Sequence, residues 1–440
     1  MTRIDPQSPA EDSLASAVRR LDQTTNWESR PRVRMRPSLD PIRDLLERLD
    51  VAPAAIPVVH VAGSKGKGSV ASLVAAGLAR AGLRVGRYGS PHVERMNERV
   101  VIDGDEVSGE VLGRGLHAAL DAREAARAAG SAGAESTWFD LVTAAALRIF
   151  AEARVDWIVA EVGLGGRLDS TNVLDGEVCV VTSIELEHTN VLGGTLAAIA
   201  GEKAGIFHAG CDVVTGVKSG SEAGRVIDAR AAELGVKISH ALEVLEGSHG
   251  SMTLAARNRC LATTVLEVLR YRKHRGLVDG PPSHKLLDLA TCAAARLPGR
   301  GERFLLEGTP VVLDGAHTPG SVTRTLEDLR AAPNLPGRPV VVLGLAVEKD
   351  LAGVLKALRG VADSLVCTSV GGALHQAPEE IARVAASVEM EARIATCPTD
   401  ALQTALHLAR SGGWVLILGS LYLAGALRPH LGLPEQDLSC

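Results

Sequence analysis

Apolar and polar residues alternate along the chain in blocks that predict an α/β fold. Short runs rich in Val and Ile, typical of strands buried on both faces, are separated by longer Ala- and Leu-rich stretches with helical spacing. Such alternation favours a parallel sheet covered by helices on both faces. In the first part of the chain we predict strands at 56–62, 85–88, 157–161, 178–184 and 212–215, and helices at 13–21, 40–49, 69–81, 109–129, 139–153, 196–204 and 222–234.

The alternation stops and then restarts. Residues 270–284 are rich in Arg, Lys, His, Gly and Pro, which predicts a surface loop. Beyond it we predict strands at 311–313, 340–343, 364–368 and 414–418, and helices at 321–329, 351–358, 379–386 and 400–409. We therefore expect two α/β domains, a large one at 1–297 and a smaller one at 298–440.

Composition and charge narrow the range of partners. Of the 440 residues, 46% are hydrophobic and 22% are charged, and the formal net charge is -5. This excludes a disordered chain and gives no electrostatic reason to expect binding to nucleic acid or to an anionic membrane. No apolar run approaches the length of a membrane span, and residues 1–20 are polar rather than a basic run followed by an apolar core, so we expect no secretion signal. We expect a cytoplasmic monomer whose partners are small molecules.

The cysteines are scattered along the chain. There are seven, at positions 179, 211, 260, 292, 367, 397 and 440, and none belongs to a C-x-x-C pair. This spacing predicts buried or free thiols in a reducing compartment, with no disulfide framework and no zinc site.

A glycine-rich segment, Gly63-Ser64-Lys65-Gly66-Lys67-Gly68-Ser69, follows the first predicted strand and opens a helix. Glycines let several backbone N–H groups point at one anion, the helix N-terminus adds its positive end, and Lys67 can reach the outer phosphates of a nucleotide. In the standard Walker form a hydroxyl residue follows the lysine directly, whereas here Gly68 stands between Lys67 and Ser69. We predict a nucleotide phosphate site, with an ordinary glycine turn as the alternative.

Polar side chains also follow three further predicted strands. Glu161 ends the strand at 157–161, His188 follows the strand at 178–184, and Ser90 follows the strand at 85–88. Open parallel sheets place their ligands at this edge, and a carboxylate is a hard oxygen ligand that suits Mg²⁺. A surface loop or a structural histidine would explain each feature alone, but three at successive strand ends favour a site.

Two other candidates have ordinary alternatives. Lys203 lies near the end of an apolar helix, where a lysine is usually a helix C-terminal cation. Asp314 follows a predicted strand and precedes a helix, which also suits a simple capping turn.

Taken together, these motifs resemble the folylpolyglutamate synthase and dihydrofolate synthase family, a branch of the Mur ligase superfamily. The resemblance runs from about Arg43 to Leu427, nearly the whole chain. The motifs that carry it are His60-Val61-Ala62-Gly63 with Gly66-Lys67-Gly68-Ser69, Gly89-Ser90-Pro91-His92 with Asn97-Glu98-Arg99, Glu161 to Asp169, Glu202-Lys203-Ala204-Gly205-Ile206, Leu297-Pro298-Gly299-Arg300, Asp314-Gly315-Ala316-His317 and Gly419-Ser420-Leu421-Tyr422.

The resemblance implies a large P-loop-type parallel-sheet ATPase domain that also binds the pterin, followed by a smaller Rossmann-like glutamate ligase domain. It implies ATP-dependent addition of L-glutamate to the carboxylate of dihydropteroate, of tetrahydrofolate (to make polyglutamates), or of both, through an acyl phosphate. ATP is then a substrate and Mg²⁺ a cofactor, with a second divalent or monovalent cation as an option.

The resemblance also implies a role for each candidate residue. The catalytic residues are Lys67, His188 and Lys203, and Lys203 matches a lysine that carries a carbamate. The metal ligands are Ser90, Glu161 and His188. The ATP-binding residues are Gly63, Ser64, Lys65, Gly66, Lys67, Gly68, Ser69, Arg300 and Asp314. The substrate-binding residues are Thr137, Trp138, Phe139, Asp140, Arg167, Leu168, Asp169 and His317.

Some positions depart from the family pattern. They are Ser64-Lys65 for Thr-Asn, Trp138 and Asp140 for Phe and Glu, Glu187 for Asp, Thr318 for Asn, and Cys260 for an Asn that contacts ATP, although Asn258 lies two residues away. These changes leave the acceptor open, so a Mur-type amide ligase with a different acid acceptor is the first alternative. The others are a nucleotide-binding module without catalysis and a dinucleotide-dependent oxidoreductase, which the missing G-x-G-x-x-G spacing disfavours.

Overall fold

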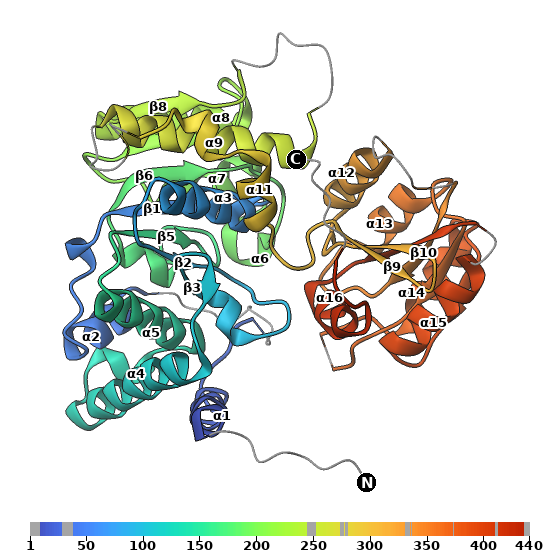
Figure 1. Cartoon of the computed structure of the whole chain (residues 1–440), viewed down its shortest axis with the longest axis horizontal. Coiled ribbons are helices and arrows are strands. Elements are labelled where there is room, and N and C mark those ends of the chain that lie inside the picture. Colours follow the sequence, from blue (N-terminus) through green and yellow to red (C-terminus); the bar gives the residue numbers. More distant parts are fainter. Residues whose placement is uncertain are drawn as a thin grey trace. The chain divides into compact units, whose positions relative to one another are not determined.

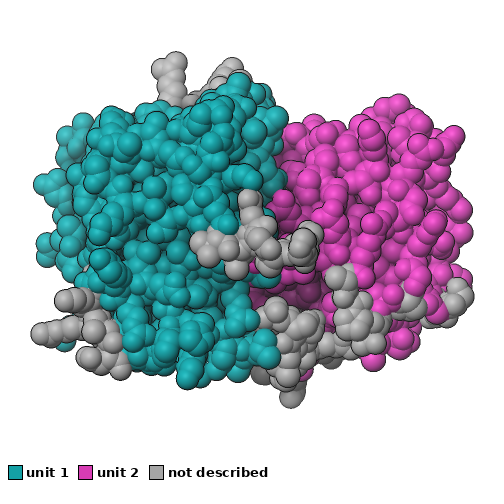
Figure 2. Space-filling model, turned by 90° about the horizontal axis from the view of Figure 1, so that it is seen from above, with its two compact units in different colours: residues 1–92, 96–250, 256–295 teal, residues 93–95, 251–255, 296–440 magenta. Residues whose placement is uncertain are grey.

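The computed structural model describes residues 9–28, 38–243, 252–272, 277, 280–330, 335, 337–372, 374–409 and 412–434. The chain forms two compact units (Figure 2). Unit 1 comprises Met1–His92, Met96–Gly250 and Ala256–Ala295, and unit 2 comprises Val93–Arg95, Ser251–Ala255 and Arg296–Cys440. Among the described residues, no helix is both long and apolar enough to cross a membrane.

Unit 1 is built on an eight-stranded sheet with the order β4-β3-β2-β5-β1-β6-β7-β8 (Figure 1). The six strands from β2 to β8 in this order are parallel, while β3 and β4 form an antiparallel edge. The strands are β1 Val58–Ala62, β2 Val85–Tyr88, β3 Val100–Ile102, β4 Asp105–Glu106, β5 Trp157–Glu161, β6 Gly176–Val181, β7 Asp212–Thr215 and β8 Lys237–His240.

Helices cover both faces of this sheet, so every residue of β1, β2 and β5 is buried. Successive side chains point to opposite faces: Val58 packs with α4 and α5, whereas Val59 and Val61 pack with α3 and α9. The helices are α1 Pro9–Leu21, α2 Asp40–Arg48, α3 Lys67–Arg80, α4 Gly109–Ala129, α5 Trp138–Ala153, α6 Thr189–Leu192, α7 Leu196–Ala204, α8 Glu222–Leu234, α9 Leu254–Tyr271, α10 Ser283–Leu286 and α11 Leu289–Ala294.

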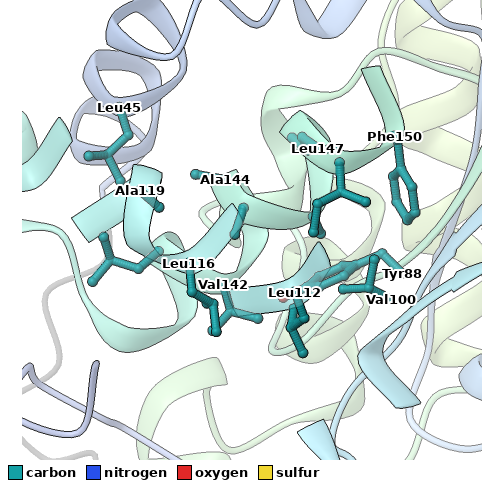
Figure 3. Packing of buried hydrophobic residues seen from close by; sticks show 14 of the residues in the cluster. Leu45, Tyr88, Val100, Leu112, Leu116, Ala119, Val142, Ala144, Leu147 and Phe150 are labelled. Carbon is teal, nitrogen blue, oxygen red and sulfur yellow. The ribbon is translucent and has the colours of Figure 1, made fainter. Parts of the chain in front are cut away.

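Figure 3 shows part of the core on the α4 and α5 face. Leu112 and Leu116 of α4 point toward Val142 of α5, and Phe150 lies near Tyr88 of β2. All five side chains are at most 1% exposed. This packing holds Tyr88, the last residue of β2, against α5.

Unit 2 has a six-stranded sheet with the order β13-β12-β11-β14-β10-β9, in which only β9 is antiparallel to its neighbour. Helices α15 and α16 pack on one face and α12, α13 and α14 on the other. The elements are β9 Glu302–Leu306, β10 Thr309–Leu313, β11 Pro339–Leu343, β12 Ser364–Cys367, β13 Ala392–Ile394, β14 Trp414–Leu418, α12 Pro319–Arg330, α13 Leu351–Leu358, α14 Pro378–Ser387, α15 Pro398–Ala409 and α16 Leu421–Leu427.

A short stretch from early in the chain, Val93–Arg95, belongs to unit 2. Glu94 forms an ion pair with Arg428, which also pairs with Glu302. The Val93 carbonyl oxygen lies so close to Gly425 that a Cβ atom there would be 2.0 Å away. Unit 2 therefore includes this stretch as part of its packing.

The predicted α/β fold class, with a large parallel-sheet unit and a smaller sheet unit, is confirmed. Several predicted elements need correction. Helix α3 begins at Lys67, two residues before its predicted start, and β6 ends at Val181, because Thr182 and Ser183 leave the sheet to bind the glycine-rich loop. Helix α9, the short helices α6, α10, α11 and α16, the edge strands β4, β8, β9 and β13, and strand β3 beside β4 were not predicted.

The loop predicted at 270–284 is shorter than expected. Helix α9 continues to Tyr271, and α10 begins at Ser283. Residues 273–276, 278 and 279 of this stretch lie outside the described residues.

Candidate active site

The polar groups predicted at four strand ends come together at one edge of the unit 1 sheet. Strands β2, β5, β1 and β6 are parallel neighbours in this order. Their carboxyl ends lead into Ser90, Glu161, the Gly63–Ser69 loop and the Thr182–His188 segment respectively. Such an edge is where open α/β sheets bind their ligands.

The segment after β6 holds the glycine-rich loop in place. The Ser64 N–H donates to the Ser183 carbonyl oxygen at 2.8 Å, and the Lys65 N–H donates to Ser183 Oγ at 3.0 Å. The Thr182 hydroxyl donates to the Lys65 carbonyl oxygen at 2.6 Å. Gly63, at φ 144°, passes so close to Thr182 that a Cβ atom would lie 1.9 Å from Oγ1. These contacts fix the backbone of residues 63–65, directly upstream of helix α3.

Asn258 of α9 lies against the loop from the other side. It is 6% exposed, and a Cβ atom on Gly66 would lie 2.5 Å from Asn258 Oδ1. Cys260 instead donates its thiol hydrogen to the Ala241 carbonyl oxygen at 3.2 Å. Of the two candidates for the ATP-contacting position, Asn258 is therefore the one whose amide lies beside the loop.

Two lysines share one backbone oxygen of the loop. Lys67 Nζ and Lys203 Nζ donate to the Gly63 carbonyl oxygen at 3.0 and 2.9 Å. Lys203 Nζ also donates to Glu187 Oε1 at 3.1 Å. The Lys203 side chain is 3% exposed, and that of Glu187 is 10% exposed. Lys203 does lie in the last turn of α7, but its side chain is buried and bonds to the glycine-rich loop.

Burial and crowding of like charges change the acidity of this pair. Burial lowers the pKa of Lys203 to about 8, the nearby Lys67 ammonium acts in the same direction, and Glu187 opposes both. Burial alone would raise the pKa of Glu187, but Lys203, Lys67 and Lys65 outweigh it and lower that pKa to about 2. Glu187 is thus a firm carboxylate, while the Lys203 amine loses its proton more readily than an ordinary lysine.

Glu161 is buried beside the Gly89–Ser90 turn. The Ser90 N–H donates to Glu161 Oε2 at 3.1 Å, and Glu161 is 6% exposed. Burial lowers the pKa of the neighbouring Arg87, while the Glu161 carboxylate raises it. His188, at φ 47°, directly precedes α6 in the loop that follows β6. The Ser90 hydroxyl, the Glu161 carboxylate and the His188 imidazole are donor types that suit a divalent cation.

Asp169 supports the turn that follows β5. Its Oδ2 accepts a hydrogen bond from the Leu164 N–H at 2.8 Å, and its Oδ1 accepts from the Thr171 N–H and hydroxyl at 3.0 and 2.6 Å. Burial raises the pKa of Asp169, and these hydrogen bonds oppose that rise. Leu168 is half-buried, whereas the Arg167 side chain is 54% exposed and pairs with Glu202 at 2.8 Å. Arg167 is therefore the more available of these side chains.

The segment 137–140 forms the first turn of α5. Thr137 and Asp140 form a reciprocal capping box, and the Ser170 hydroxyl donates to Asp140 Oδ1 at 2.6 Å. Trp138 is 4% exposed, and its ring lies 4.8 Å from Arg99 Cζ. The Phe139 ring packs against Gly163. Trp138 and Asp140, which depart from the family pattern, thus make structural contacts, while Thr137 and Phe139 are half-buried.

The predicted residues of unit 2 lie around the turn after β10. Asp314 Oδ1 accepts from the Ala316 N–H at 2.8 Å and from the Thr325 hydroxyl at 3.3 Å. Burial raises the pKa of Asp314, and the nearby Arg300 guanidinium opposes that rise. His317 Nδ1 lies 2.7 Å from the Gly315 carbonyl oxygen. Thr318 accepts from the Ser321 N–H at 3.3 Å, so it serves as a cap for α12.

The family described as Mur ligase, glutamate ligase domain, matches residues 299–421. A dihydrofolate synthase/folylpolyglutamate synthase of Escherichia coli is 33% identical over 350 residues, which cover 76% of this chain and 78% of that protein. The chain belongs to the folylpolyglutamate synthase and dihydrofolate synthase family. It is an ATP-dependent ligase that adds glutamate to folates.

Solved structures of this family share the whole fold. Mycobacterium tuberculosis folylpolyglutamate synthase, complexed with ADP, superimposes with a TM-score of 0.82 at 28% identity and covers 97% of this chain and 100% of that chain. The bifunctional folylpolyglutamate synthase/dihydrofolate synthase of Yersinia pestis, complexed with AMPPNP and a Mn ion, gives a TM-score of 0.78 at 29% identity and covers 98% and 100%.

Proposed function

We propose that this ligase joins L-glutamate both to dihydropteroate and to tetrahydrofolate, with Mg²⁺ as its metal. The observation that carries the proposal is the shared Gly63 carbonyl oxygen, which brings Lys67, Lys203 and Glu187 to the phosphate loop. The bifunctional names of the Escherichia coli and Yersinia pestis relatives support the pair of acceptors. The ADP complex of the M. tuberculosis enzyme supports the nucleotide.

In this proposal the loop holds the ATP phosphates. The N-terminus of α3 directs backbone N–H groups from Gly66 to Ser69 toward an anion. Lys67 exchanges its bond with the Gly63 carbonyl oxygen for one with a phosphate oxygen. Ser64 and Lys65 flank the same phosphates, and Asn258 borders the loop beside Gly66.

Ser90, Glu161 and His188 would hold Mg²⁺ on the neighbouring strand ends. When bound, the ion neutralises phosphate charge during transfer to the acceptor carboxylate. The role of Glu161 is to keep a carboxylate fixed at this edge, and the Ser90 N–H orients its Oε2. A second divalent or monovalent cation remains part of the proposal, and the Glu187 carboxylate is a further anionic group near it.

Lys203 is proposed to carry a carbamate. Its neutral amine attacks CO₂, a C–N bond forms, and one proton is released, which leaves an anionic carbamate in place of a cation. The lowered pKa of Lys203 favours the neutral amine that this step requires. Protein equilibrated with ¹³C-bicarbonate should show a carbamate carbon signal that is missing from Lys203→Arg. If both proteins give the same spectrum, Lys203 is not modified.

The folate acceptor would contact those predicted substrate-binding residues that are exposed or half-buried. Arg167, Leu168, Thr137 and Phe139 are available for contact, whereas Trp138, Asp140 and Asp169 position the loops that carry them. In unit 2, Arg300 and Asp314 are proposed to contact ATP, and His317 to contact a substrate.

The test is ADP release by the purified protein with ATP, Mg²⁺ and L-glutamate, and with dihydropteroate, tetrahydrofolate or no acceptor. The product masses must increase by one glutamate. Release with both acceptors supports the proposal, and release with one alone reduces it to a monofunctional enzyme. Release with neither, from protein that still binds ATP, contradicts it and points to another acid acceptor.

A matched pair of variants separates the two loop lysines. Lys67→Ala should abolish ADP release, because Lys67 bonds the Gly63 oxygen from within the loop. Lys65→Ala should retain most of it. Equal losses in both variants would contradict the specific role of Lys67.

A further inference from the structure

Unit 1 contains a second cluster of ligand-type side chains that the ligase reaction does not use. Cys179 on β6, Cys211 directly before β7 and His208 in the turn between α7 and β7 each offer a ligand atom, and these atoms lie within 4.8 Å of one another. Cys179 is 0% exposed and Cys211 is 2% exposed. The two cysteines are far apart in sequence, which is why their spacing predicted no zinc site.

His208 has the surroundings of a metal ligand. One ring nitrogen, Nε2, lies 2.8 Å from the Gly176 carbonyl oxygen, and Nδ1 lies 3.0 Å from the Ala209 carbonyl oxygen. To bind an ion, one of these nitrogens must turn away from its carbonyl oxygen, and the other can then donate its hydrogen to a carbonyl. Metal-bound histidines are usually oriented by a hydrogen bond of this kind.

His60 adds an independent observation beside the cluster. It pairs with Cys179 across β1 and β6, is 0% exposed, and its Nδ1 has no hydrogen-bond partner in the described part of the chain. The Thr171 hydroxyl donates to Asp169, so Thr171 Oγ1 must accept from His60 Nε2, 2.9 Å away. The hydrogen is then on Nε2, and Nδ1 keeps the bare lone pair that a metal ligand needs.

We propose that Cys179, Cys211 and His208 bind Zn²⁺, and that the nearby His60, which lies outside their 4.8 Å group, moves in as the fourth ligand. Two thiolates and two imidazoles form a tetrahedral set that suits Zn²⁺ and that Mg²⁺ does not favour. The ion has an entry path, because Ala209 and Gly210 in the turn beside Cys211 are exposed.

A bound ion would join three parts of unit 1. Two side chains already hold the turn at 205–208: the Cys179 thiol donates to the Ile206 carbonyl oxygen at 3.2 Å, and the Asn172 amide donates to the Gly205 carbonyl oxygen at 3.2 Å. Zn²⁺ would add a link between β1, β6 and this turn. The role proposed for the ion is structural: it would anchor the turn that follows α7 to the sheet.

The first experiment uses the full-length protein, so it needs no variant to fold. The metal-free chain is loaded with Zn²⁺ in excess Mg²⁺, dialysed, and examined by metal analysis and zinc X-ray absorption. We expect one Zn²⁺ per chain with two sulfur ligands. Failure to retain Zn²⁺, or a zinc shell without sulfur, would overturn the proposal.

Variants then assign the ligands, with Co²⁺ as a probe that gives a thiolate charge-transfer band. Cys211→Ser should weaken binding by more than about 100-fold, the upper range for loss of a supporting group. Cys292→Ser is the matched control, because Cys292 is another buried thiol and lies outside the cluster. An unchanged band in Cys211→Ser overturns the site.

His60→Phe tests the fourth ligand, and it should lower Co²⁺ affinity while the two-sulfur band remains. Full affinity in this variant would overturn the role of His60.

Discussion

The strand-end turns of the two units differ in where their partners come from. In unit 1, Lys203 reaches the Gly63 carbonyl oxygen over 140 positions of sequence, and Glu187 completes the contact. In unit 2, the Asp314 carboxylate accepts hydrogen bonds from residues 2 and 11 positions away, while the backbone of its turn bonds to Gly299, Ile417 and Gly419. The side-chain contacts of the unit 1 turn therefore join segments far apart in sequence, whereas the Asp314 side chain is oriented mainly by residues near it in sequence.

In unit 1 the same buried pair therefore affects both activity and stability, whereas in unit 2 the Asp314 side chain affects mainly activity. A buried ion pair such as Lys203 with Glu187 leaves a costly lone charge when one partner is removed. Asp314, by contrast, is half-buried, and replacing its carboxylate by an amide removes the charge but keeps an oxygen that can accept its hydrogen bonds. Variants of the two turns should therefore behave differently in stability measurements, even where both reduce activity.

The largest effect is expected for Lys203. Lys203→Met should abolish ligase activity and, compared with native protein kept free of CO₂ so that Lys203 is an unmodified cation, lower the free energy of unfolding by about 3–5 kcal/mol, because the buried Glu187 loses its Lys203 partner. Lys203→Met with Glu187→Leu should regain most of this stability without activity. Urea unfolding and ADP release measure both quantities, and a double variant that is as unstable as the single one would contradict the pairing.

The next effect is a pH dependence that comes from Glu187. Its pKa is about 2 in the folded protein, below the ordinary 4.5, so the unfolded chain takes up the proton first as the pH falls. Its contribution to stability is complete above pH 4.5 and is lost as the pH falls toward 2. The difference in unfolding free energy between the native protein and Glu187→Gln should shrink over this window.

Glu152 provides the control for this titration. It pairs with Arg148 on the surface of α5, with its side chain 53% exposed. Glu152→Gln should differ little from the native protein at any pH. If both variants show the same pH profile, the effect does not come from the buried pair.

A moderate effect is expected for Asp314→Asn in unit 2. The Asn oxygen can still accept from the Ala316 N–H, so the free energy of unfolding should change by less than about 1 kcal/mol. Loss of the charge beside Arg300 should raise the KM for ATP by about 10-fold, the lower range for a hydrogen bond to a charged group. A large loss of stability would show that this turn resembles that of unit 1.

The smallest stability effect is expected for Arg167→Ala. The Arg167 ion pair with Glu202 is exposed, so its loss should cost less than about 0.5 kcal/mol. The KM for the folate acceptor should nevertheless rise several-fold, while the KM for ATP stays constant. A rise in the KM for ATP alone would remove Arg167 from the acceptor side.

The hydrophobic pattern predicted the elements of the sheet cores well. Strands 85–88, 157–161, 212–215 and 414–418 have the predicted bounds, because fully buried strands are short apolar runs with clear ends. The edge strands were missed, since edges such as Asp105–Glu106 carry exposed polar residues. Helix α9 could have been found from its apolar positions 261, 262, 265, 266 and 269, which have helical spacing.

The candidate site was predictable only where it is local. The glycine-rich loop and Glu161 are recognisable because each adjoins its own strand. The contacts of Asn258 with Gly66 and of Lys203 with Gly63 join residues that are far apart in sequence. Helix packing and strand order decide such contacts, and neither the spacing nor the composition of the chain contains them.

The stretch Val93–Arg95 has a consequence for how this chain can be divided. A gene fragment that begins at Arg296 would encode unit 2 without Glu94, one of the two partners of Arg428, and without the backbone that fills the space at Gly425. Fusions, split reporters or permuted genes that keep the two halves separable must therefore supply this short peptide to the C-terminal half.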